Sequence, residues 1–112
     1  MQILRNPITK SELAGIAKDQ FGNFVKAVAD IGRSILAIGG ELHADCEALL
    51  LEDGSRQEDL WGINIHPGKL GEERIEFNSM INVRPSQGNR SRSVENLETR
   101  ERVRIIVNKL IV

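Results

Sequence analysis

The feature that most constrains the fold is the run from Asn23 to Gly39, where hydrophobic residues recur at every second position. A period of two is typical of a β-strand that buries one face. In the first half of the run, that face would carry Val25, Ala27, Ala29 and Ile31. The pair Gly32-Arg33 suits a tight turn, after which residues 34–38 return as a mostly apolar strand. The run therefore predicts an antiparallel β-hairpin.

A second hairpin is predicted further along the chain. Its first strand ends at Pro67-Gly68 and carries three alternating hydrophobic residues, Trp61, Ile63 and Ile65. We interpret Trp61 as a core residue. The returning strand alternates from Ile75 to Val83 and ends before Pro85. The polar face of this hairpin is expected to carry Asn64, His66, Asn78, Asn82 and Arg84.

Three helices are expected between and after these strands. The first runs from about residue 11 to Phe21 and is capped by Thr9 or Ser11. The last is capped by Asn96 and buries a stripe made of Val103, Ile106, Val107, Leu110 and Ile111. Residues 41–53 form either a helix that stops at Gly54 or a strand joined to the next strand by a hairpin turn at residues 53–55. We favour the helix, because alanine, glutamate and leucine dominate this stretch.

With a short first strand at Gln2–Leu4, the elements follow the order β-α-β-β-α-β-β-α. This order predicts an α+β fold, a largely antiparallel sheet of four to five strands with about three helices, mostly on one face. A chain of 112 residues with 40% hydrophobic and 28% charged residues predicts a single globular domain over residues 1–112. The single cysteine, Cys46, excludes an intramolecular disulfide and a multi-cysteine zinc site, and we interpret it as a small core residue.

Charge is distributed unevenly, although the net formal charge is only −1. Residues 41–60 contain seven acids and one base, whereas residues 84–109 contain seven bases and three acids. We interpret these segments as solvated helix faces that attract each other; a homodimer that pairs them, or a site that uses both signs, are the alternatives. The small net charge gives no general attraction to nucleic acid or membranes. Because no apolar run could span a bilayer or direct export, we expect a cytoplasmic protein.

Two stretches carry a resemblance to a known family. They are GSRQEDLWGIN at residues 54–64 and NVRPSQGNRS at residues 82–91. Both resemble signatures of a small bacterial family of unknown function, and the similarity extends over nearly the whole chain. The resemblance implies a compact intracellular domain and supplies no activity or catalytic residue.

The best candidate site is the polar loop from Arg84 to Ser93, for which we expect a small anion or a protein partner. Arginine binds phosphate or carboxylate groups through paired hydrogen bonds, and Gly88 allows a turn that directs backbone N–H groups at an anion. The loop lacks the Gly-Lys-Ser/Thr triplet of phosphate loops, and an ordinary surface turn is the alternative. The candidate ligand-binding residues are Arg84, Ser86, Gln87, Asn89, Arg90 and Arg92, with Asn82, Asn64 and His66 as a pocket wall.

The sequence supports catalysis and cofactor binding less well. His43, Asp45 and Glu47 would share a metal-binding face only in a strand, and the favoured helix separates them, so we expect neither a metal nor another cofactor. No serine lies in a nucleophile-elbow sequence. The aromatic residues are interpreted as core or half-core, so nucleic acid is not favoured. The alternatives to a binding domain are phosphoester or RNA cleavage by His66 with Arg84, and a structural homo-oligomer.

Overall fold

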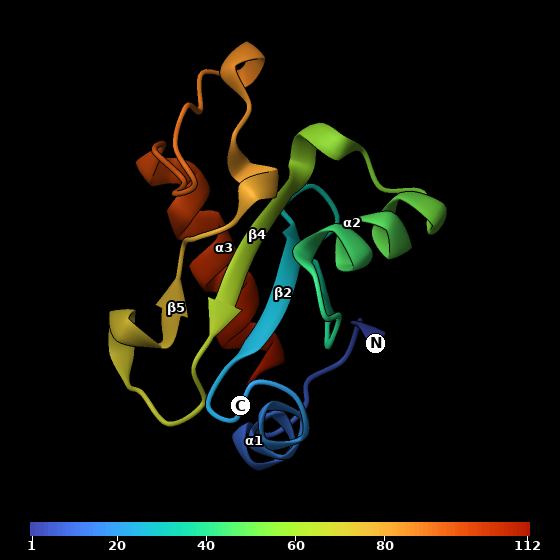
Figure 1. Ribbon diagram of the computed structural model, residues 1–112, viewed down its shortest axis with the longest axis vertical. Helices are drawn as coiled ribbons and strands as arrows, with labels where there is room; N and C mark the ends of the chain where they lie inside the picture. Colours follow the sequence, from blue (N-terminus) through green and yellow to red (C-terminus); the bar gives the residue numbers. More distant parts are fainter.

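The computed structural model describes residues 1–112 and contains a five-stranded antiparallel sheet with three α-helices (Figure 1). The strand order is β1-β3-β2-β4-β5. The strands are β1 (Gln2–Leu4), β2 (Val25–Asp30), β3 (Ile35–Ile38), β4 (Leu60–Ile65) and β5 (Ile75–Glu76). The helices are α1 (Lys10–Asp19), α2 (His43–Glu52) and α3 (Leu97–Leu110). The predicted α+β class and the predicted order of elements are confirmed.

The first predicted hairpin is formed by β2 and β3, next to each other within the sheet. Asp30 closes it, because its Oδ1 accepts hydrogen bonds from the backbone N–H groups of Gly32 and Arg33, both at 2.9 Å. A short acidic side chain that bonds the backbone two and three residues ahead favours a turn. Ser34 completes the turn with a φ of 56° and donates its N–H to the carbonyl of Asp30.

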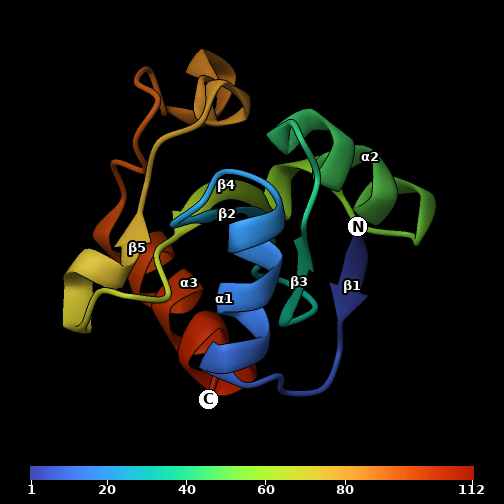
Figure 2. The same ribbon diagram turned by 60° about the horizontal axis from the view of Figure 1, so that its bottom comes forward.

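The helices lie on both faces of the sheet (Figure 2). Helices α1 and α3 cover one face and form the larger hydrophobic core with alternate residues of the strands. Helix α2 covers part of the other face, where Cys46 and Leu50 pack against residues such as Val28. The acidic α2 and the basic α3 thus lie on opposite faces of the sheet. One ion pair, between Glu47 and Arg84, joins the two charged segments.

Side-chain caps explain where two of the helices begin. Thr9 Oγ1 accepts from the N–H of Glu12 at the start of α1, and Asn96 Oδ1 accepts from the N–H of Thr99 at the start of α3. The helix favoured for residues 41–53 is confirmed as α2, and Cys46 is fully buried, as predicted. The predicted buried stripe of α3 and the core position of Trp61 are confirmed as well. None of the helices is both long and apolar enough to cross a membrane.

The second predicted hairpin is correct only at its base. Strand β5 contains two residues, whereas the sequence pattern predicted a strand from Ile75 to Val83. Beyond Glu76 the side chain of Asn82 replaces the strand, since it accepts from Gly62 N–H at 2.8 Å and donates to the Gly62 carbonyl at 2.9 Å. The amide side chain thereby satisfies the backbone groups that a longer β5 would have paired. Gly62 is needed for this approach, because an added Cβ would lie 2.6 Å from the Cβ of Ser79.

The aromatic residues also differ from the expectation at one position. Phe21 is 38% exposed, so the interpretation of every aromatic side chain as core or half-core was wrong. Its ring stacks on Phe24, with centroids 4.8 Å apart, and Phe24 in turn lies against His66. The segment after α1 therefore carries a short aromatic stack at the surface.

Candidate functional site

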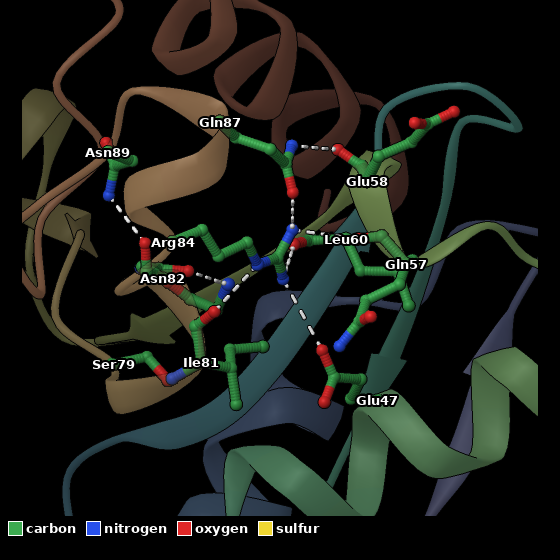
Figure 3. Close-up of polar contacts among 11 residues, drawn as sticks. Glu47, Gln57, Glu58, Leu60, Ser79, Ile81, Asn82, Arg84, Gln87 and Asn89 are labelled. Atoms are coloured by element: carbon green, nitrogen blue, oxygen red, sulfur yellow. Dashed lines mark hydrogen bonds and ion pairs between the residues drawn. The ribbon is translucent and has the colours of Figure 1, made fainter.

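Arg84, the first residue of the predicted binding loop, is buried against the chain itself (Figure 3). Its Nε donates to the carbonyl of Ile81, and its terminal nitrogens donate to the carbonyls of Gln57 and Leu60. The remaining terminal N–H groups face Gln87 and Glu47, each at 3.4 Å. Burial lowers the pKa of Arg84, and the Glu47 carboxylate opposes that shift. All five N–H donors of the guanidinium group are thus engaged within the protein.

Asn89 is buried within the loop and holds the rest of it in place through hydrogen bonds. Its Nδ2 donates to the carbonyls of Asn82 and Ser93, at 2.6 and 2.7 Å, and its Oδ1 accepts from the N–H of Glu95. The turn at Gly88, with a φ of 78°, lets the chain reverse around this amide. Asn82 and Asn89 are both buried, and both hold backbone groups of the loop in place.

The backbone N–H groups that we expected to bind an anionic ligand donate instead to a carboxylate of the chain itself. Glu95 Oε2 accepts from the N–H groups of Arg90 and Ser91, at 2.5 and 3.2 Å. The side chains of Ser86, Gln87 and Arg90 are exposed. Arg92 is exposed as well, and its Nε donates to Asn78. Some of the predicted loop residues are thus buried and support the loop, whereas the others are exposed side chains at the surface.

Asn64 and His66, the predicted pocket wall, both contact Glu76 of β5. Asn64 pairs with Glu76 across the β4–β5 ladder, and its Nδ2 donates to Glu76 Oε1 at 3.0 Å. His66 Nε2 lies 3.3 Å from the same oxygen. These contacts, the Asn64 hydrogen bond first, lower the pKa of Glu76, although partial burial opposes them. Asn64 Oδ1 and His66 Nδ1 are buried and have no hydrogen-bond partner in the chain.

His43, at the start of α2, was considered as a metal ligand. Its Nε2 lies 2.8 Å from the carbonyl of Ile63, and because a carbonyl only accepts, this nitrogen carries the proton. Burial lowers the pKa of His43, so the ring is held in its neutral form. Glu47, its neighbour one turn along α2, points to Arg84 instead. The two side chains therefore serve different contacts.

Basic side chains from distant parts of the sequence surround a hollow of about 360 Å³ between α1, α3 and the segment that precedes β5. In Figure 2 that segment is the yellow turn beside α3. Arg104 and Asn108 reach the hollow together, because residues four apart share one face of a helix. The polar lining residues are Lys10, Lys69, Arg74, Arg104, Asn108 and Glu72. Four bases thus face one acid in this basic hollow.

Among the residues that line the basic hollow, Arg74 has the most unusual environment. It is only 7% exposed, and its Nη2 donates to Asn108 Oδ1 at 2.8 Å. Burial lowers its pKa, and no nearby carboxylate opposes that shift. A guanidinium group keeps its charge in proteins, so Arg74 carries a buried positive charge without a negative partner. Arg84, by contrast, has Glu47.

Arg104 is the second guanidinium group of the basic hollow. Its Nε is buried and has no hydrogen-bond partner in the chain. The terminal nitrogens lie 3.9 Å from Glu72 and 3.5 Å from Glu101, two carboxylates that are largely exposed. Ion pairs with such exposed carboxylates contribute little to stability, so they compete only weakly with another anion for Arg104. The guanidinium carbon lies 5.6 Å from the ring centroid of Phe77, within the range of a cation–π contact.

Sequence reasoning did not find the basic hollow. Lys10 lies in α1, Arg104 lies in α3, and Lys69 and Arg74 lie in the connection between β4 and β5, so no single spacing links the four bases. Only Arg104 and Asn108 form a local pattern, at positions i and i+4 of a helix. The predicted loop attracted attention because its arginines are close in sequence, but Arg84 and Arg90 differ completely in burial.

One comparison with known proteins agrees with the resemblance found in the sequence, in that it gives a family of unknown function. A family model described as "Protein of unknown function (DUF5674)" matches residues 2–110. No curated protein and no solved structure matches the chain. Since the family model spans nearly the whole fold, the chain belongs to this family of proteins of unknown function.

Proposed function

We propose that the protein binds a small anion, specifically a phosphate group, in the basic hollow. The observation that carries this proposal is the buried guanidinium group of Arg74, which has no carboxylate partner. A charge that is largely removed from water is unfavourable without a partner, and proteins normally pair such groups. An anion in the hollow would supply the missing negative charge.

The donors around the basic hollow suit a tetrahedral oxyanion. Arg74 uses one hydrogen bond within the chain, to Asn108, which leaves further N–H groups of its planar fork. The Nδ2 group of Asn108 remains a donor, because its Oδ1 is the atom that accepts from Arg74. Lys10 and Lys69 add mobile ammonium groups at the rim. Four positive charges against Glu72 favour a doubly charged phosphate over a single carboxylate.

Calorimetric titration with inorganic phosphate at low salt tests the proposal. We expect Arg104→Gln to weaken phosphate binding about tenfold or more, because one charged hydrogen-bonding group is lost. Lys69→Gln is the second variant and should also weaken phosphate binding, because Lys69 is an exposed base that lines the hollow. The matched control is Arg90→Gln, which removes an exposed arginine of the predicted loop.

Two outcomes would overturn the proposal. The first is an unmodified protein that takes up no phosphate in the titration. The second is a loss of affinity in Arg90→Gln equal to that in Arg104→Gln, which would return the site to the predicted loop. Circular dichroism of each variant shows whether the fold is retained.

A further inference from the structure

A second hollow adjoins the basic hollow at Lys69, which lines both. Its volume is about 410 Å³, and it lies between α1 and the loop that follows β4. Its other lining residues are mostly small and uncharged: Ala14, Ala17, Gly22, Asn23, Pro67 and Gly68, with His66. A charged group is thus favoured in the basic hollow and an uncharged group in this second hollow.

His66 gives the second hollow a fixed aromatic wall. Glu76 holds one edge of the ring through Nε2, at 3.3 Å. The ring of Phe24 lies 5.5 Å from that of His66, and Phe21 stacks on Phe24. The side chain of His66 is only 13% exposed, so its orientation is set before any ligand arrives. A rigid ring beside a floor of alanine and glycine suits a flat group better than a bulky one.

We propose that the phosphate bound in the basic hollow belongs to a nucleoside monophosphate, whose base occupies the second hollow against His66. This inference rests on the proposed phosphate site. Each hollow alone is at the small end of the roughly 300–1,000 Å³ range of ligand sites. Together, joined at Lys69, they offer a charged half and an uncharged half, which is the division of charge in a nucleotide. Histidine and other aromatic rings are common stacking partners of bases.

The experiment compares inorganic phosphate, ribose 5-phosphate and adenosine 5′-monophosphate in calorimetric titrations of the whole protein. We expect the nucleotide to bind at least fivefold more tightly than ribose 5-phosphate, the lower end of what stacking one base contributes. His66→Ala should abolish this ratio and leave the affinity for inorganic phosphate unchanged. The control is His43→Ala, because His43 is the one other histidine and lines neither hollow.

A second readout keeps the test independent of small affinity differences. Stacking against a base shifts the ring proton resonances of His66 in NMR spectra, whereas phosphate and ribose 5-phosphate leave them in place. Equal affinity for ribose 5-phosphate and the nucleotide, with no shift of the His66 ring, would overturn the nucleotide proposal and leave phosphate binding intact. Failure of all three ligands to bind would remove both proposals.

Discussion

Replacing Arg84 by methionine should destabilise the protein severely, although Arg84 belongs to the most polar loop of the sequence. The substitution keeps a long apolar side chain and removes every hydrogen bond of the guanidinium group. Three backbone carbonyls lose their donor, those of Gln57, Leu60 and Ile81. Glu47, whose side chain is 15% exposed, loses its only charged partner. The guanidinium group also leaves its position 4.9 Å above the ring of Trp61.

The size of the effect follows from the buried charge that remains. Removing one partner of a buried ion pair costs about 3–5 kcal/mol, because the other charge is left without compensation. A domain of ordinary stability has about 5–15 kcal/mol in total. We therefore expect Arg84→Met to lower the free energy of unfolding by about 3–5 kcal/mol. The double variant Arg84→Met with Glu47→Gln should recover part of this loss, because the stranded charge is gone.

Urea unfolding measures the loss. Trp61, the single tryptophan, reports it by fluorescence, and far-ultraviolet circular dichroism is the second probe, because the substitution changes the surroundings of Trp61. Arg90→Met is the control and should change the free energy of unfolding by at most about 0.5 kcal/mol, as is usual for exposed sites. A loss below about 1 kcal/mol in Arg84→Met would refute the reasoning and leave Arg84 free to bind a ligand.

Two further predictions concern the packing of β4 and the neutral histidine. Gly62→Ala should lower the free energy of unfolding by about 1–3 kcal/mol, because the new Cβ would overlap Ser79; an unchanged urea midpoint would contradict this. Burial lowers the pKa of His43 from 6.5, so below that pH the unfolded chain binds a proton before the folded protein does. Stability is therefore lost as the pH falls from 6.5 towards the lower folded value. His43→Gln should lose less stability over that window, and urea midpoints measured on either side of 6.5 decide whether it does.

Periodicity in the sequence predicted those parts of the fold that backbone pairing determines. The hairpin of β2 and β3 and the stripe of α3 follow directly from the spacing of hydrophobic residues. The premature end of β5 could not be predicted in this way, because the side chain of Asn82 takes over the pairing of Gly62. An asparagine in a strand-like pattern is equally compatible with an exposed position, so its burial follows only from the tertiary structure.

The candidate site was less predictable for a related reason. Arginines close together in sequence suggested a binding loop, yet burial gave Arg84 a supporting role and left Arg90 at the surface. The basic hollow depends on the fold, which brings Lys10, Arg74 and Arg104 together from three distant segments. What distinguishes Arg74 is the absence of a compensating carboxylate, and that property has no counterpart in a linear pattern.

The most direct test of the central claim is an NMR titration of the ¹⁵N-labelled protein with inorganic phosphate. It follows the backbone amides together with the arginine Nε–H groups, so it locates the bound anion on the fold. We predict saturable shifts at Arg74, Arg104 and the amides from Lys69 to Arg74, with residues 84–93 unchanged. Shifts confined to residues 84–93, or no saturable shift at all, would contradict the account.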